Sequence, residues 1–282
     1  MTRMDAEHLL KQGDLDGALA ALQSDIRKAP ENARLRVFLF QLLAVQGNWQ
    51  RAVAQLKTSA TLDPAAETMA QTYRAAILCE GVREKVFAGL TAPIILGEPE
   101  AWTANLIEAL KVQARGEFQA AEDLRGEAFE AAPAVPGHLD GVPFSWIADA
   151  DPRLGPILEV ILNGRYVWVP FASLKSLTLE APSDLRDSVW MPATLTLANG
   201  GSSVALIPTR YPGTHKAPDA RLHLSHATSF VMEDGLAVAG LGQRLLATDT
   251  QECALMNIRE LVMGPAQDAG EAEAAEAGLA DG

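Results

Sequence analysis

Three histidines that lie close together in the last third of the chain are the residues whose type and spacing could do chemistry. His215, His223 and His226 have Asp219 and Ser225 among their neighbours, and such a group can hold a metal ion or activate a nucleophile. A metal-assisted or histidine-dependent hydrolase is therefore one hypothesis. However, His223 and His226 are three residues apart, a spacing that suits one face of a helix and not one face of a strand. Because turn-forming residues surround them, we favour histidines in solvated loops.

Other catalytic signals are weak. Asp149 and Asp151 are spaced like a carboxylate pair, but the proline that follows them favours a turn at the start of a strand. The chain contains no GxxxxGK[ST], GxSxG or HExxH motif. The fragment GLG at 240–242 opens a strand-like segment and not a helix, so it does not indicate a dinucleotide site. We therefore expect no enzymatic activity, no cofactor and no metal.

The segment 184–214, DLRDSVWMPATLTLANGGSSVALIPTRYPGT, combines charged, aromatic and turn-forming residues. Its candidate partner-binding residues are Arg186, Trp190, Arg210 and Tyr211. The final YPGT predicts a type II turn that presents Arg210 and Tyr211 at the end of a strand. The same residue types also suit an arginine–aspartate pair that fixes a corner of the fold, with Trp190 in the core. Both interpretations stay open, and the residue types favour the structural one.

The first half of the chain repeats itself. A glycine, an alanine, a leucine and a proline recur at an offset of 34 residues, as Gly13/Gly47, Ala18/Ala52, Leu22/Leu56 and Pro30/Pro64. Another copy contains Gly116, Ala121 and Pro133, and a weaker copy contains Gly81. This period is typical of tetratricopeptide repeats, in which pairs of antiparallel helices stack into a curved array. The groove of such an array can bind a helix or an extended peptide.

The second half has the pattern of strands. Apolar runs flank Asn-Gly pairs at 163–164 and 199–200, which predicts two tight hairpins. Further strands are expected over 174–179, 228–232, 243–248 and 254–262, and Pro170, Pro192 and Pro208 are expected at strand ends or edges. We therefore predict an α+β protein, with a tetratricopeptide-like helical repeat array followed by a mostly antiparallel β domain that forms a partly closed barrel.

Composition limits the partners and sets the domain boundaries. The net charge of −13 over 282 residues disfavours nucleic acid, and no apolar run is long enough to span a membrane. Two cysteines outside any CxxC pair, and a start without a signal peptide, favour the cytoplasm.

The expected domains are a helical repeat domain at 1–136, a β domain at 137–263 and a disordered acidic tail at 264–282.

Between residues 6 and 262 the chain resembles the ImpE family, also called TagJ, of type VI secretion accessory proteins. The resemblance is carried by blocks in the family's order, FSWIADADPRLGPILEVILNGRYVWVPF, LEAPSDLRDSVWMPATLTLANG, LIPTRYPGT and GLGQRLLATD. It implies a cytoplasmic, non-enzymatic adaptor that binds the small subunit of the contractile sheath and is linked to the ATPase that disassembles the sheath. It implies no catalytic residue.

An assembly chaperone that uses the same repeat groove is the alternative closest to this adaptor. The sequence does not separate the two, and it does not indicate the oligomeric state, the role of the acidic tail or which surface binds which partner.

Overall fold

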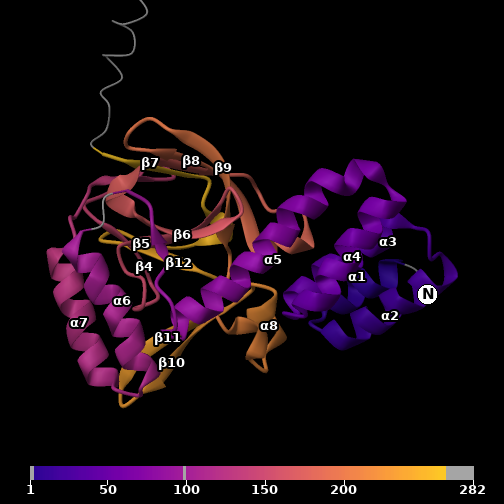
Figure 1. The fold of residues 1–282 in the computed structure, drawn as a ribbon, viewed down its shortest axis with the longest axis horizontal. Coiled ribbons are helices and arrows are strands. Elements are labelled where there is room, and N and C mark those ends of the chain that lie inside the picture. The colour runs from indigo at the N-terminus through magenta and orange to yellow at the C-terminus, as the bar shows by residue number, and fades with distance from the viewer. Residues whose placement is uncertain (1–2, 98–99, 265–282) are drawn as a thin grey trace, which may run out of the picture.

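The computed structural model describes residues 3–97 and 100–264, so the predicted acidic tail lies outside the described residues except for Gly264. The longer helices come first, with one two-residue strand among them, and the other strands follow (Figure 1). The longer helices are α1 (Arg3–Lys11), α2 (Leu15–Lys28), α3 (Ala33–Val45), α4 (Trp49–Leu62), α5 (Glu67–Phe87), α6 (Ala101–Ala114) and α7 (Phe118–Ala131). The short helices are η1 (Pro64–Ala66), η2 (Phe171–Ser173), η3 (Leu185–Ser188), η4 (Thr214–Lys216), α8 (Ala220–His223) and η5 (Leu255–Asn257).

The strands follow the same order along the chain. They are β1 (Ile94–Ile95), β2 (Gly137–Leu139), β3 (Val142–Phe144), β4 (Ile147–Asp149), β5 (Ile157–Leu162), β6 (Arg165–Pro170), β7 (Leu174–Leu179), β8 (Trp190–Leu197), β9 (Ser202–Pro208), β10 (Thr228–Glu233), β11 (Leu236–Gly242), β12 (Leu245–Thr248), β13 (Glu252–Ala254) and β14 (Glu260–Met263). None of the described helices combines the length and apolar character needed to cross a bilayer.

The repeat pattern correctly predicts three helical hairpins. Gly13, Gly47 and Gly116 lie at the turns of α1–α2, α3–α4 and α6–α7, and all three have the positive φ that glycine tolerates. Asp14 begins α2 by accepting the Gly17 N–H at 2.8 Å, a regular N-cap. Local chemistry is therefore enough to define where these helices begin and turn.

The weak copy at Gly81 does not form a hairpin. Gly81 lies inside α5, a continuous helix of 21 residues that separates the first two hairpins from α6–α7. In Figure 1, α1–α4 lie at one end of the molecule, α5 runs towards the strands, and α6–α7 lie at the opposite side. The seven helices therefore do not form one uninterrupted array.

The strands form open sheets, so the prediction of a partly closed barrel is wrong. The described strands form a nine-stranded sheet in the order β1-β6-β5-β9-β8-β7-β14-β2-β3, a three-stranded sheet β13-β12-β4 and the ribbon β10-β11. The large sheet ends in β1, with two residues, and in β3, with three. These short edge strands do not pair with each other among the described residues, and closure needs such pairing.

The turn signals are mostly confirmed. Asn163 and Gly164 both have positive φ, as a two-residue type I′ turn requires, and they join β5 to β6. Gly213 has φ 82° and ψ −6°, the third position of the predicted type II turn. The second Asn-Gly pair instead lies in the longer connection between β8 and β9. The predicted strand over 254–262 is also interrupted, because η5 separates β13 from β14.

Two apolar cores meet at strand β5. Ile157 and Ile161 face a core shared with α1–α7, whereas Leu158 and Val160 face a core between the large and the three-stranded sheet. Both faces of β5 are therefore buried, which explains the nearly continuous apolar run ILEVIL. The one charged residue of that run, Glu159, faces the helices.

Candidate functional site

A buried set of charged residues joins α5 to the β domain. We call Glu80, Arg83, Glu159, Arg244 and Asp149 the junction network. Arg83 on α5 donates to both carboxylate oxygens of Glu159 on β5, from Nε at 2.6 Å and from Nη2 at 2.7 Å. Arg244, just before β12, donates to Glu159 and to Asp149 at the end of β4. One carboxylate on β5 therefore holds arginines from two other parts of the chain.

The junction network continues through neutral side chains. The Tyr166 hydroxyl donates to Glu159 and accepts the indole N–H of Trp168 at 2.7 Å. Glu80, one helical turn before Arg83, accepts the indole N–H of Trp190 at 2.9 Å. Every polar atom in this chain of contacts has a partner, which is the condition for a buried polar network to hold one arrangement of the fold.

Charge complementarity decides the ionisation state of Glu159. Burial alone would raise the pKa of this carboxyl group, but attraction to Arg83 and Arg244 outweighs burial and lowers the pKa to about 2. Burial raises the pKa of Asp149 to about 7 against the attraction of Arg244. Glu159 is therefore the permanent anion at the centre of the junction network.

Arg210 binds the end of a helix. Its guanidinium donates to the carbonyl oxygens of Ala44 at 2.8 Å and of Val45 at 2.6 Å, and to His223 O at 2.8 Å. The first two carbonyls belong to the last turn of α3, where a cation stabilises the helix dipole. Burial lowers the pKa of Arg210 to about 10, which still leaves it charged at neutral pH. Arg210 therefore fixes the repeat helices to the segment that follows β9.

The other predicted site residues pack around the same junction. Trp190 is completely buried between Tyr73 and Trp49, with ring centroids 5.8 and 5.9 Å away. Tyr211 is buried, and its hydroxyl accepts the Leu245 N–H at 2.9 Å. Arg186 is partly exposed and lies over the ring of Tyr73, 4.8 Å from its centroid.

These positions decide which of the four residues can face a partner. Trp190, Arg210 and Tyr211 contact other parts of the same chain and offer almost no surface, so the interpretation as a structural corner describes them. Arg186 also pairs with Asp184 at 2.5 Å, as that interpretation expects. Partner binding through Arg186 stays a prediction.

The three histidines have different surroundings. His215 is packed edge-on against Trp49, His223 Nε2 is 2.7 Å from the Ala217 carbonyl oxygen, and His226 is exposed. His215 and His223 are thus partly buried and not the solvated loop residues that we predicted. Asp151 forms a two-point pair with Arg153, and Asp149 binds Arg244, so both carboxylates are structural. No group of three or more His, Cys, Asp and Glu residues in the described chain could hold a metal ion.

His215 is expected to make the protein sensitive to acid. Burial and then the charge of Arg210 lower its pKa from 6.5 to about 4, although Glu84 lies 3.6 Å from Nε2. Between these two pKa values the unfolded chain binds a proton that the folded chain does not, so the free energy of unfolding falls as the pH decreases. Because the imidazole is partly exposed, we expect a loss of roughly 1–2 kcal/mol.

Urea unfolding at about pH 7 and about pH 5 measures this loss. His215→Phe keeps the ring contact with Trp49 and should remove this part of the pH dependence. The exposed His226 is the matched control, and His226→Phe should behave like the wild type. Equal pH dependence in the wild type and in His215→Phe would contradict the assignment.

A groove of about 440 Å³ lies at the junction. We call it the junction groove. One wall comes from Leu10 on α1 and from Phe38 and Gln41 on α3, and the opposite wall comes from Leu185 on η3 and from Leu224 after α8. A smaller hollow of about 210 Å³ adjoins it along α3 and shares Phe38, Gln41 and Asp184. The junction groove therefore needs both halves of the chain.

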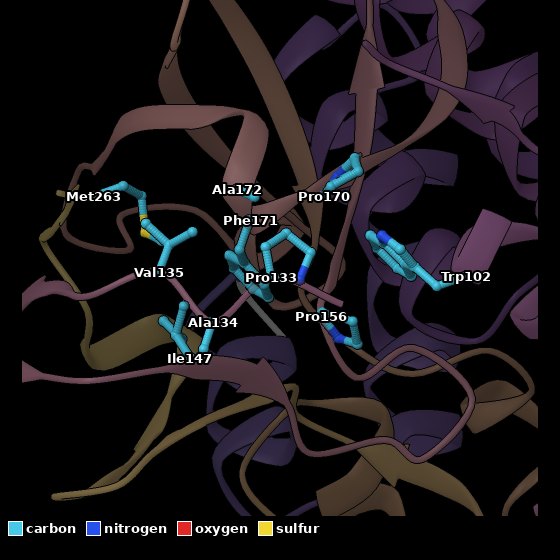
Figure 2. Close-up of a pocket in the computed structure, with 10 residues that line it drawn as sticks. All are labelled: Trp102, Pro133, Ala134, Val135, Ile147, Pro156, Pro170, Phe171, Ala172 and Met263. Atoms are coloured by element: carbon cyan, nitrogen blue, oxygen red, sulfur yellow. The ribbon is translucent and has the colours of Figure 1, made fainter. Parts of the chain in front are cut away.

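A second cavity is too small for an organic ligand. Figure 2 shows its lining of prolines and apolar side chains, with Trp102 from α6 on one side and Met263 from the end of β14 on the other. Its volume of about 20 Å³ is enough for a water molecule. Ligand pockets are usually about 300–1,000 Å³, so this cavity is a packing defect between α6 and the sheet.

Sequence reasoning missed the residues that hold the junction together. Glu80, Arg83, Glu159 and Arg244 are all buried, and none was a candidate. Glu159 had a signal, because a carboxylate inside the apolar run ILEVIL must find a cation when the strand is buried. The partners of Glu159 are 76 and 85 residues away in sequence, so no local pattern could name them.

Tetratricopeptide-like helical hairpins packed against a β-rich second half define a two-part α+β class of protein. Comparison with known proteins identifies the family. Residues 9–77 match the tetratricopeptide repeat, and residues 141–262 match the model described as ImpE protein. The chain is 55% identical over 262 residues to the type VI secretion system accessory component TagJ of Pseudomonas aeruginosa, covering 93% of this chain and 92% of that protein. It belongs to the ImpE/TagJ family of type VI secretion accessory proteins.

A solved structure supports the fold. The crystal structure of protein VPA1032 from Vibrio parahaemolyticus matches with a TM-score of 0.83 at 24% sequence identity, and the match covers 94% of this chain and 99% of that one. Helical hairpins and a β-rich part in this arrangement are therefore common to two sequences that have diverged widely.

Proposed function

We propose that this chain is a non-enzymatic adaptor of the type VI secretion system that works in the cytoplasm and binds an amphipathic helix of the small sheath subunit. The observation that carries the proposal is the junction groove, whose two apolar walls come from the repeat helices and from the segment around η3. The tetratricopeptide match and the accessory role named for the Pseudomonas aeruginosa relative support it.

The lining of the junction groove suits a helix. Leu10, Phe38, Leu185 and Leu224 supply apolar contacts, whereas Glu7, Lys11 and Asp184 supply charges of both signs. A helix bound there would present apolar side chains at positions i, i+3, i+4 and i+7, and its charged residues would remain near the solvent. The sequence predicted a groove formed by the repeats alone, whereas the repeats supply only one wall of the junction groove.

The remaining surface is available to the ATPase that disassembles the contracted sheath. Resemblance to the family supports this second partner, which would bind away from the junction groove. An assembly chaperone that uses the same groove differs in its target, because it would bind the unassembled sheath subunit and not the finished sheath.

Calorimetry of the full-length chain with the N-terminal helix of the small sheath subunit from the same gene cluster tests the adaptor. We expect saturable binding, and Leu185→Asp should weaken it at least about tenfold by placing a charge in an apolar wall. Leu78 lies outside the groove and is 73% exposed. Leu78→Asp is therefore the matched control and should bind like the wild type.

Two results would count against the proposal. The first is no binding to the sheath helix by a folded full-length chain. The second is equal affinity of Leu185→Asp and the wild type, which would move the binding site away from the junction groove. Comparing assembled sheath with free subunit then separates the adaptor from the chaperone.

A further inference from the structure

The ribbon β10–β11 has an unpaired edge. Among the strands that the structure describes, β10 pairs only with β11, and the two strands project beside the ends of α6 and α7 (Figure 1). In an antiparallel pair, alternate residues direct their backbone N–H and C=O groups away from the partner strand. On β11, Gly240 and Gly242 do so, because their N–H groups donate to Asp151 at 3.0 Å and to Thr214 at 2.9 Å.

The register then shows which groups of β10 face outwards. Phe230 pairs with Gly240 and Thr228 pairs with Gly242, so these two residues and Met232 direct their backbone groups to the outer edge. Among the hydrogen bonds of the described residues, none reaches the backbone at this edge. Exposed strand edges are normally protected by lysine or proline, and the sequence TSFVME of β10 contains neither.

The apolar side chains of β10 also pack outside the apolar cores. Phe230, Val231 and Met232 belong to none of the apolar cores, and Met232 is 57% exposed. A two-stranded ribbon alone is marginally stable in water. A further strand along β10 would satisfy the free backbone groups and would cover these side chains in the same step.

We propose that the outer edge of β10 pairs with β10 of a second copy of this chain. Antiparallel pairing around a two-fold axis is self-complementary when Phe230 lies opposite the second copy's Phe230, because the outward-facing Thr228 then lies opposite Met232. In this register Glu233, the charged residue of β10, lies opposite the uncharged Ala227 that precedes the strand. No charged residue of β10 lies opposite a like charge, so the edge suits its own copy.

The pairing is expected to be weak. A ladder of six residues in each copy buries less than the roughly 1,200–2,000 Å² of a stable interface. The net charge of −13 also opposes association at low salt. Dimers should therefore form in the upper micromolar range and increase with ionic strength.

Sedimentation velocity of the full-length chain, from micromolar to millimolar concentration, tests this pairing. We expect a concentration-dependent shift from monomer to dimer. Met232→Pro removes one outward N–H from each copy and leaves the hydrogen bonds between β10 and β11 intact. Because of the two-fold axis, the dimer loses two intermolecular hydrogen bonds. Met232→Pro should therefore raise the dissociation constant at least about tenfold. Met232→Thr loses the same apolar side chain but keeps the N–H, and it should dimerise more strongly than the proline variant.

Circular dichroism and thermal melting must match the wild type in both variants, so that a folding defect does not imitate lost pairing. A chain that stays monomeric at every concentration overturns the proposal, even if its edge binds an extended segment of another protein. A dimer that Met232→Pro leaves unchanged also overturns it, because the contact would then lie elsewhere.

Discussion

Glu159→Gln is expected to lower the free energy of unfolding by about 3–5 kcal/mol, the usual cost of removing one partner from a buried ion pair. The change keeps the shape of the side chain but leaves Arg83 and Arg244 without the anion between them. Both guanidinium groups are buried, so water cannot replace the lost charge. Urea unfolding of the full-length variant, followed by tryptophan fluorescence, measures the loss.

Two comparisons make this result specific. Glu108 forms an exposed pair with Lys111 at 2.8 Å, and Glu108→Gln, the matched control, should unfold like the wild type. Arg83→Met combined with Glu159→Gln should cost less than the two single changes added together, because the double variant removes both charges. A Glu159→Gln variant as stable as the wild type would show that the junction network contributes nothing to stability.

Cutting the chain after residue 136 is expected to abolish cooperative folding of the helical segment. The core that contains residues of α1–α7 also contains Ile157, Tyr166, Trp168 and Trp190 from the β domain, so the cut exposes its centre. It also removes Arg210, which holds the last turn of α3. Circular dichroism should show reduced helicity, and urea should produce a broad transition.

The matched control is residues 1–264, which keeps every described element. This control and the full chain should both unfold cooperatively. A helical segment 1–136 with a sharp unfolding transition would instead establish the predicted boundary as a boundary between independently folding domains. The same fragment should fail to bind the sheath helix, because one wall of the junction groove is missing.

Family membership and most local structure could be predicted from the sequence. Gly13, Gly47 and Gly116 indicated the helical turns, and Asn163-Gly164 indicated the hairpin of β5 and β6. These signals are local, because a positive φ or a helix cap depends on residues only a few positions apart. The sheet order was not predictable in this way, and the barrel expectation failed because pairing at the sheet edges depends on distant strands.

The roles of the candidate residues were decided only by the tertiary structure. An arginine next to a tyrosine in TRYPGT allows either a surface for a partner or a corner of the fold, and the residue types only favour the corner. Folding places the Arg210 guanidinium against the carbonyl oxygens of Ala44 and Val45, 166 and 165 residues away, and that contact decides between the two. The same holds for Glu159. The apolar sequence of its strand indicates that Glu159 needs a cation, but it does not indicate which residues supply the positive charge.

The sequence by itself therefore determined the family, the helical repeats and the strand character of the second half, because periodicity and turn chemistry act over short distances. The tertiary structure alone decided that α5 carries charges into the β domain and that the groove has walls from both halves. The physical reason is burial. A charged side chain must be paired when it leaves water, and only the folded chain brings Arg83 and Arg244 to Glu159.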